Sequence, residues 1–175
     1  MEIETPRLRL RPWRPEDKPA LLRHADNPKV ARNLTNIFPS PYTEADADEW
    51  LDARENDEAP CRLFAIVIDG EAAGGIGIHT REDVHAKTAE IGYWLAELHW
   101  GQGYMTEALR ALVPYAFATF DLHRLEAYHF GWNPASGRVL EKAGFRLEGC
   151  LRERICKNGA YTDSLMYGLL QDEYL

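Results

Sequence analysis

A short apolar run, a turn with two glycines and a long helical pattern follow one another near the middle of this chain. Together they constrain its fold more than any other segment. The run at residues 91–95 has the composition of a strand, and Gly101 and Gly103 lie in the turn. No aspartate or glutamate occurs from Leu98 to Met105. A strand that passes through glycines into a helix directs several main-chain N–H groups at one point, where the helix dipole adds positive potential. The segment predicts an α/β fold with a site for an anion such as phosphate.

Length and composition limit the class of protein further. The chain has 175 residues and a net charge of −8, which predicts a single domain over residues 1–175 and argues against general nucleic-acid binding. Residues 1–5 are acidic and lack the apolar core of a signal peptide, and no apolar run approaches the ~20 residues that span a membrane. The three cysteines, Cys61, Cys150 and Cys156, form no disulfide or zinc spacing. We therefore expect a cytoplasmic protein that binds no metal, nucleic acid or membrane.

Hydrophobic periodicity and turn residues predict strands and helices on both sides of the glycine turn. Thr43 and Asn133 are expected to cap the helices that they precede. Gly74, Gly75 and Gly77 lie inside one strand and indicate a bulge or a close neighbour. The predicted strands are residues 8–11, 63–68, 72–78, 87–98, 124–130, 145–154 and 161–170, and the predicted helices are residues 15–25, 43–56, the segment from the glycine turn to about 120, and 133–144. Hairpin turns are expected at residues 69–70 and 157–159. The fold class is a mixed α/β chain around one sheet.

Two common phosphate loops do not fit the glycine turn. The chain contains no Gly-x-x-x-x-Gly-Lys-Ser/Thr sequence, so the turn is not the loop of a nucleotide-triphosphate enzyme. A dinucleotide loop that begins at Gly101 would need glycine or alanine at position 106, where this chain has Thr106. A different class of phosphate-bearing ligand is therefore expected.

The order of several short runs resembles one known superfamily. They are Glu-Ile-Gly-Tyr-Trp-Leu at residues 90–95, Trp-Gly-Gln-Gly-Tyr-Met-Thr-Glu-Ala at 100–108, Asn-Pro-Ala-Ser at 133–136 and Glu-Lys-Ala-Gly-Phe at 141–145. The sequence resembles the GNAT superfamily of acyl-CoA-dependent N-acetyltransferases, and within it the RimJ/RimL-like branch of ribosomal-protein N-terminal acetyltransferases. Residues 5–11 and 158–163 resemble that branch as well. Two residues depart from the loop pattern of the superfamily. Trp100 lies where the pattern has glutamine or arginine, and Met105 lies at the final position, where the pattern has a small residue.

The resemblance implies a fold and a co-substrate. The fold is the acyl-CoA N-acyltransferase fold, a single-domain, mostly antiparallel mixed sheet with a splayed central strand pair flanked by helices. The co-substrate is acetyl-CoA, whose pyrophosphate meets main-chain N–H groups of the loop and whose pantetheine arm pairs with strand backbone. We expect this main-chain binding to survive the bulk of Met105. The residues implied in cofactor binding are Leu95, Ala96, Glu97, Gly101, Gln102, Gly103, Tyr104, Met105, Thr106, Asn133 and Ser136.

Acetyl transfer to an amine sets the expected catalytic roles. The thioester oxygen gains charge and needs a donor, which we assign to a backbone N–H near Leu95. A thiol has a pKa of about 8.5 and leaves readily, so proximity supplies much of the rate. By resemblance, Ser136 is the donor near the sulfur, although a serine there also satisfies its own helix end. Glu90 is a candidate base for the neutral amine, with alternatives at His79, His99 and His129. Tyr161 and Asp163 shape the substrate mouth or tie the last strand.

These expectations define two functional hypotheses. The first is an N-acetyltransferase that moves acetyl from acetyl-CoA to a primary amine by direct attack in a ternary complex. The acceptor is a protein N-terminus or a small molecule, and a homodimer is common among such proteins. The second is a non-catalytic acyl-CoA-binding sensor or docking module with the same fold, since a fold alone does not guarantee activity. In the first hypothesis, the acidic helix at residues 43–58 would steer a cationic acceptor if it borders the cleft, and it is otherwise a solvated face.

Overall fold

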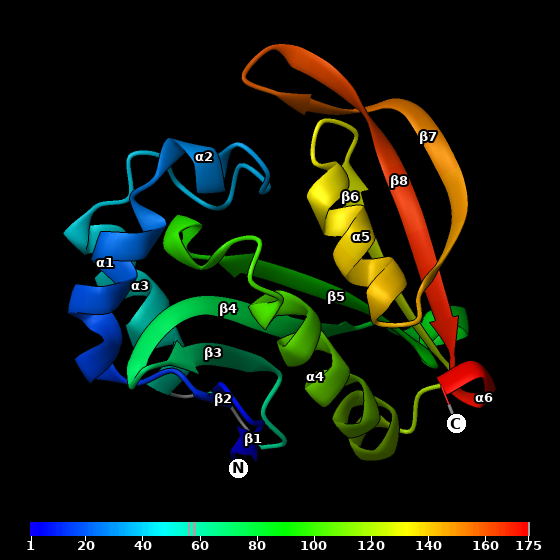
Figure 1. The fold of residues 1–175 in the computed structure, drawn as a ribbon, viewed down its shortest axis with the longest axis horizontal. Coiled ribbons are helices and arrows are strands. Elements are labelled where there is room, and N and C mark those ends of the chain that lie inside the picture. Colours follow the sequence, from blue (N-terminus) through cyan, green and yellow to red (C-terminus); the bar gives the residue numbers. More distant parts are fainter. Residues whose placement is uncertain (56, 58, 175) are drawn as a thin grey trace. The chain divides into compact units, whose positions relative to one another are not determined.

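The computed structural model describes residues 1–55, 57 and 59–174 of the 175-residue chain. It contains an eight-stranded sheet in the order β1-β2-β3-β4-β5-β6-β8-β7, and β5 pairs with β6 in parallel (Figure 1). The pairs β1–β2, β2–β3, β3–β4, β6–β8 and β7–β8 are antiparallel. The predicted mixed, mostly antiparallel α/β fold is confirmed. Among the described residues, none of the helices combines the length and apolar character that a membrane crossing requires.

The strands and helices have the following bounds. The strands are β1 (Ile3–Glu4), β2 (Arg9–Pro12), β3 (Leu63–Ile68), β4 (Glu71–Thr80), β5 (Thr88–Leu95), β6 (Arg124–Phe130), β7 (Arg146–Lys157) and β8 (Ala160–Leu170). The α-helices are α1 (Lys18–Ala25), α2 (Pro28–Ala31), α3 (Glu44–Glu55), α4 (Tyr104–Phe120), α5 (Pro134–Lys142) and α6 (Gln171–Tyr174). Three 3-10 turns are η1 (Pro15–Asp17), η2 (Asp83–His85) and η3 (Glu97–His99).

The described chain forms two compact units. The first comprises Met1–Gly77 and Tyr93–Ala111, and the second comprises Ile78–Gly92 and Leu112–Leu175. The strands β4 and β5 and the helix α4 each pass from one unit to the other. Residues of the predicted site therefore occur in both units.

Buried aromatic and aliphatic side chains hold α1 and α3 in the first unit. Leu21 of α1, Leu51 of α3 and Trp13 after β2 belong to one apolar cluster. Thr43 caps α3 as predicted, because its hydroxyl accepts from the Asp46 N–H at 3.3 Å and its own N–H donates to the Asp46 carboxylate at 2.7 Å. The predicted last residue of this helix, 56, lies outside the described residues.

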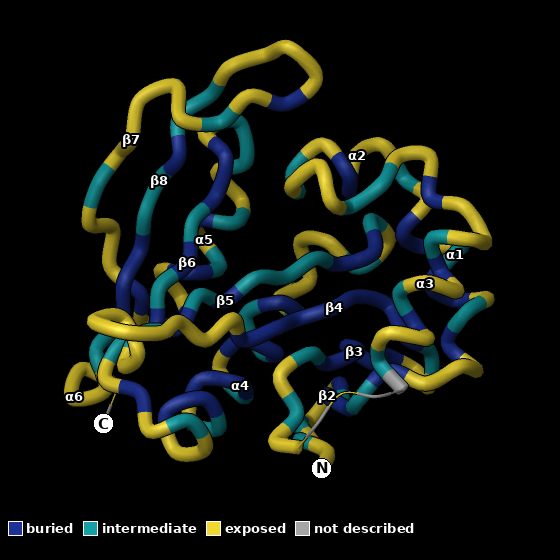
Figure 2. The backbone as a smooth tube through the Cα atoms, turned by 180° about the vertical axis from the view of Figure 1, so that it is seen from behind, coloured by how far each residue is buried: buried dark blue, intermediate teal, exposed yellow. Residues whose placement is uncertain are grey.

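Glycines in β4 allow a close approach of the end of β5. A Cβ at Gly74 would collide with the carbonyl oxygen of Trp94, and one at Gly75 would lie 2.8 Å from the Trp94 indole nitrogen. The β3–β4 register also shifts between Ile66 and Val67, which is a bulge. Both predicted meanings of the glycine cluster, a bulge and a close neighbour, are confirmed. Figure 2 shows β3 and β4 buried over most of their length.

In the second unit, α5 packs closely on β6 and β8 through a glycine. A Cβ at Gly137 would lie 2.7 Å from Nε2 of His129 and 2.9 Å from the hydroxyl of Tyr167. The β7–β8 hairpin turns at Asn158 and Gly159, whose φ angles are 51° and 79°. This is the Asn-Gly turn that the sequence predicts. Most of β7 is exposed (Figure 2).

Some predicted elements are wrong in extent or contact. The strand expected over residues 87–98 ends at Leu95, because the chain turns into η3 at Glu97. Between the two, the Ala96 N–H donates to the Ala73 carbonyl at 2.8 Å. The elements β1, α2, α6 and η2 were not predicted, since each has four residues or fewer and carries little periodicity. Asn133 begins α5 without a side-chain cap hydrogen bond. Its carbonyl accepts from the Ser136 N–H at 3.1 Å, so a main-chain hydrogen bond closes this turn.

Candidate functional site

The glycine turn lies between η3 and α4 and adopts the conformation that its two glycines permit. Gly101 and Gly103 have φ angles of 73° and 82°, in the left-handed region where residues with a Cβ are strained. The exposed residues Gly101–Gly103 lead directly into the first turn of α4. Two left-handed glycines thus turn the chain from η3 into the helix over the four residues from Trp100 to Gly103.

The N–H groups of this turn meet no acceptor among the described residues. Within the described part of the chain, hydrogen bonds are absent from the main-chain N–H groups of Gly101, Gln102, Gly103, Tyr104, Met105 and Thr106. The N–H groups on either side are engaged. Trp100 donates to the Glu97 carbonyl at 3.0 Å, and Glu107 donates to the Gly103 carbonyl at 3.1 Å. A run of unpaired donors at a helix N-terminus is the arrangement that binds phosphate groups.

Side chains of the turn stabilise its shape from within. The Trp100 indole N–H donates to the Leu95 carbonyl at 2.8 Å, and the Gln102 side-chain amide donates to the Leu98 carbonyl at 2.8 Å. Trp100 therefore connects the turn to the last residue of β5. The Met105 side chain is buried in the core, at 7% exposure, so its bulk is accommodated inside the protein.

The N-terminal segment before β2 contacts the same turn. The Arg7 Nε donates to Glu107 at 2.6 Å, the Arg7 N–H donates to it at 3.0 Å, and the Thr5 hydroxyl donates to it at 2.7 Å. The Arg7 Nη1 donates to the Gln102 carbonyl at 2.9 Å, and its guanidinium lies 4.6 Å from the centre of the Tyr104 ring. The sequence of residues 5–11 resembles the RimJ/RimL-like branch, but it predicted no role for them. A single sequence contains no signal that pairs Arg7 with an acid 100 positions away.

These contacts change the acidity of Glu107. Partial burial by itself would raise the pKa of the carboxyl group, but the hydrogen bonds from Thr5 and Arg7 outweigh that effect and hold the pKa below its usual range. Glu107 is therefore ionised at neutral pH. It lies in the first turn of α4, directly after the residues whose N–H groups are unpaired. Its charge is balanced by the Arg7 guanidinium.

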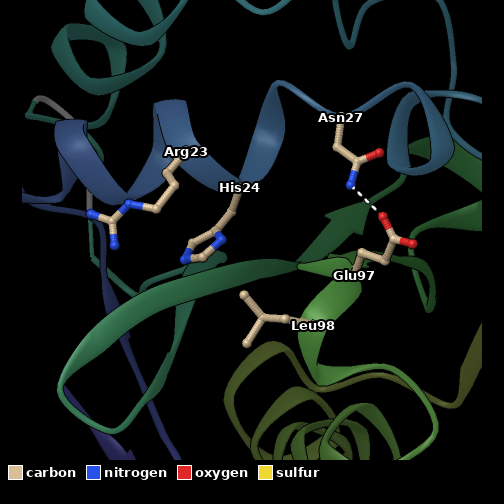
Figure 3. Close-up of a pocket in the computed structure, with 5 residues that line it drawn as sticks. All are labelled: Arg23, His24, Asn27, Glu97 and Leu98. Atoms are coloured by element: carbon tan, nitrogen blue, oxygen red, sulfur yellow. Dashed lines mark hydrogen bonds between the residues drawn. The ribbon is translucent and has the colours of Figure 1, made fainter.

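A pocket of 530 Å³ adjoins η3 on the side of α1. It is lined by Arg23, His24, Asn27, Glu97 and Leu98 (Figure 3). The Glu97 carboxylate accepts from the Lys29 ammonium at 2.5 Å and from the Asn27 amide at 2.9 Å, and these hydrogen bonds, that from Lys29 first, lower the pKa of Glu97. The side chain of Glu97 thus ties η3 to α2. The main chain of Ala96 and Glu97 begins η3, which precedes the glycine turn.

The second unit contains the predicted residues Asn133 and Ser136 at the N-terminus of α5. Both side chains are partly exposed, and the Asn133 amide makes no cap bond to the helix. The prediction that the Asn133 side chain caps α5 is therefore wrong. A role of Asn133 in ligand binding stays a prediction. The tight contact at Gly137 fixes the first turn of α5, and with it Ser136, on β6.

Glu90 lies in the short parallel ladder between β5 and β6. Thr88–Glu90 pair with Arg124–Glu126, and within the second unit this described pairing stops there although both strands continue. Arg81 donates to Glu90 at 3.1 Å and forms an ion pair with Glu126 at 2.5 Å. Burial, followed by the nearby charge of Glu90, raises the pKa of Tyr128. The predicted base is thus an ion-paired, partly buried carboxylate where the ladder ends.

The alternative residues have other surroundings. His129 is buried, and its Nδ1 lies 2.8 Å from the Phe130 carbonyl. Burial lowers the pKa of His99, whose ring packs edge-on against Tyr104 at 5.4 Å. His79 is exposed. Asp163 accepts from the Glu153 N–H at 2.8 Å, which ties β8 to the bulged part of β7, whereas Tyr161 is exposed.

Comparison with known proteins settles the family. A family model described as an acetyltransferase (GNAT) domain matches residues 7–146. The chain belongs to this acetyltransferase family. It is 32% identical to an uncharacterized N-acetyltransferase, p20, of Bacillus licheniformis, over 98% of this chain and 97% of that protein. It is 39% identical to the ribosomal-protein-serine acetyltransferase of Escherichia coli K12, over 63% of this chain and 62% of that protein. Its fold is similar to Mycobacterium smegmatis RimJ in complex with CoA-disulfide, with a TM-score of 0.84, 28% identity and coverage of 99% and 88%.

Membership in the GNAT family gives the unpaired N–H groups a chemical context. Enzymes of this family use acetyl-CoA, and the solved structure of M. smegmatis RimJ contains a CoA-disulfide. CoA carries a diphosphate, which is the class of anion that the donors of the glycine turn would bind. The RimJ/RimL-like resemblance inferred from the sequence is confirmed at the level of family and fold.

Proposed function

We propose that this GNAT protein transfers the acetyl group of acetyl-CoA to a primary amine by direct attack in a ternary complex. The supporting observation is the run of unpaired N–H groups from Gly101 to Thr106 at the N-terminus of α4. These donors, with the helix dipole, would hold the diphosphate of the co-substrate. The remaining residues predicted for the cofactor are Leu95, Ala96, Glu97, Asn133 and Ser136.

The chemistry needs three further groups, and we assign them as follows. A main-chain N–H at Leu95 polarises the thioester carbonyl as the amine attacks. Ser136 donates a hydrogen bond to the departing sulfur. Glu90 accepts the proton of the incoming ammonium, directly or through water, so that a neutral amine attacks. The carbon–nitrogen bond forms as the carbon–sulfur bond breaks, and the second proton lost by the attacking nitrogen passes to the departing thiolate, so that the products are the amide and CoA thiol. Proximity supplies much of the acceleration.

The acceptor is a primary amine of a protein N-terminus or of a small molecule. The name of the E. coli relative, a ribosomal-protein-serine acetyltransferase, supports a protein amine. The exposed acids Asp48, Glu49 and Asp52 of α3 would favour a cationic acceptor. We further propose that residues 1–175 act as one catalytic domain, in the cytoplasm and as a homodimer.

Release of free thiol from acetyl-CoA tests this function. Purified protein is incubated with acetyl-CoA and a panel of amines that includes short peptides with a free N-terminus, and the thiol is measured against a reaction without amine. Amine-dependent release with a stoichiometric amide product is the expected result. Tight binding of CoA without amine-dependent release across the panel would instead support a non-catalytic acyl-CoA-binding module.

A further inference from the structure

The first turn of α4 contains an acid where the proposed function needs positive potential. Glu107 lies four residues after Gly103, and its N–H makes the first hydrogen bond of the helix, to the Gly103 carbonyl. A carboxylate in the first turn stabilises the helix itself but repels an anion bound at the same helix end. An unbalanced Glu107 would therefore oppose the binding of a diphosphate.

The N-terminal segment neutralises this acid. Three donors contact the Glu107 carboxylate, namely the Arg7 Nε, the Arg7 N–H and the Thr5 hydroxyl, at 2.6, 3.0 and 2.7 Å. The Glu107 side chain is only 17% exposed, so solvent screens its charge less than that of a free surface acid. Arg7 supplies the cation that balances this charge.

Arg7 also has donor capacity beyond this ion pair. Its Nη1 donates to the Gln102 carbonyl, and its Nη2 lies 3.4 Å from the position that a Cβ on Gly103 would take. Within the described residues, Nη2 has no hydrogen-bond acceptor, and the side chain is 46% exposed. Stacking on the Tyr104 ring restrains the guanidinium beside the unpaired N–H groups. A planar guanidinium held next to such a site is well suited to a phosphate oxygen.

We propose that Arg7 is a ligand of the diphosphate held by the glycine turn, and that Thr5 and Glu107 are the residues that position it. This inference rests on the proposed function, because it concerns the same diphosphate. It gives the N-terminal segment a binding role at a turn about one hundred residues away in sequence. The competing explanation is that the Arg7–Glu107 pair only fastens the N-terminal segment to α4.

A set of four variants separates these two explanations. Arg7→Met removes the cation and leaves Glu107 charged, Glu107→Gln removes the opposing charge, and the double variant removes both. Lys18→Met is the matched control. The Lys18 ammonium forms a surface ion pair with the Asp48 carboxylate at 2.7 Å, and this pair joins α1 to α3 rather than to the glycine turn. The readouts are the dissociation constant of CoA by calorimetry and kcat/KM with acetyl-CoA and with acetyl-pantetheine, a thioester that lacks the diphosphate. Circular dichroism and the melting temperature report whether each variant is folded.

If Arg7 contacts the diphosphate, Arg7→Met weakens CoA binding about 10- to 100-fold, the effect of losing a charge-assisted hydrogen bond and a balancing charge. Its kcat/KM with acetyl-pantetheine stays within about twofold of wild type. The double variant binds CoA at least about threefold more tightly than Arg7→Met, because the uncompensated carboxylate is gone. Lys18→Met leaves the dissociation constant and both values of kcat/KM unchanged.

Three outcomes contradict the inference. CoA affinity of Arg7→Met within about twofold of wild type refutes a contact with the diphosphate. Equal losses with acetyl-CoA and acetyl-pantetheine show that Arg7 only supports the fold. A double variant no better than Arg7→Met refutes the neutralising role of the pair. Failure of the proposed function is read from the wild-type protein itself. It would bind no CoA if the glycine turn held no diphosphate, and it would bind CoA without amine-dependent thiol release if the protein were a non-catalytic module.

Discussion

Replacement of Gly103 by proline tests the diphosphate site most directly. Gly103 has a φ angle of 82°, whereas proline fixes φ near −65°, so the turn cannot keep its present path. Proline also removes one N–H from the donors that the structure leaves unpaired. Loss of a hydrogen bond to a charged group costs about 1.5–3 kcal/mol, which corresponds to about 10- to 150-fold in affinity. Because the turn must also move, tenfold is the smallest loss that we expect.

Alanine at the same position separates strain from donor loss. Gly103→Ala keeps the N–H but places a Cβ in the left-handed region, which costs about 1–2 kcal/mol of stability, and the Cβ lies 3.4 Å from Arg7 Nη2. Gly159→Ala is the matched control, since Gly159 has a φ angle of 79° and a Cβ there meets no atom within 4 Å. The two alanine variants should lose similar stability, while Gly159→Ala keeps wild-type affinity for CoA.

The assay is the dissociation constant of CoA by isothermal titration, with the melting temperature measured on the same samples. We expect the order of affinity to be wild type and Gly159→Ala, then Gly103→Ala, then Gly103→Pro. A folded Gly103→Pro variant that binds CoA within about twofold of wild type would show that the glycine turn does not hold the diphosphate. The proposed site would then be wrong, whatever the activity of the protein.

Three further predictions concern catalysis, packing and acid stability. Ser136→Ala should lower kcat by only about tenfold, because a thiolate leaves without much help from a donor, and should keep CoA affinity within about twofold. An unchanged kcat would remove Ser136 from the mechanism. Met105→Ala should cost about 2–5 kcal/mol of stability through the cavity that it leaves, measured by urea unfolding, with little change in CoA affinity; a large loss of affinity in the folded variant would mean that the side chain contributes to the ligand site. Arg124 holds the pKa of Glu148 below its usual 4.5, so the ionised carboxylate contributes stability above about pH 4.5 that is lost as the pH falls through the lowered pKa. Thermal unfolding between about pH 3 and pH 6 should therefore depend less steeply on pH in Glu148→Gln, and an unchanged slope would contradict the assigned ion pair.

Local signals in the sequence predicted the elements whose geometry depends on a few adjacent residues. Asp69-Gly70 and Asn158-Gly159 form turns with positive φ angles at the predicted positions, because only such residues accept that backbone conformation at low cost. The glycine turn was predicted for the same reason. The N–H groups of Gly103, Tyr104, Met105 and Thr106 are unpaired because the first turn of any helix lacks internal acceptors. These features follow from residues that are adjacent in the chain.

Features that depend on tertiary contacts were not predictable from one sequence. Asparagine is a favoured residue at a helix N-cap, but the backbone of Asn133, at φ −115° and ψ 63°, leaves its side chain without a cap hydrogen bond. The strand that was expected to reach residue 98 ends three residues earlier, where Ala96 bonds to Ala73 and the chain turns. The pairing of Arg7 with Glu107 joins residues 100 positions apart, and neither residue carries a local mark of the other.

The site illustrates why side chains around a main-chain anion loop vary in function. The donors from Gly101 to Thr106 belong to the backbone, so the side chains of the loop are free for other contacts. Trp100 binds the Leu95 carbonyl, and Met105 fills the core. Glu107 is the side chain whose charge opposes a bound anion, and it is also the one that three donors from the N-terminal segment contact. A loop that binds through its backbone can thus tolerate a bulky residue inside it more easily than an unbalanced charge beside it, because bulk can turn into the core whereas a repulsive field reaches the ligand.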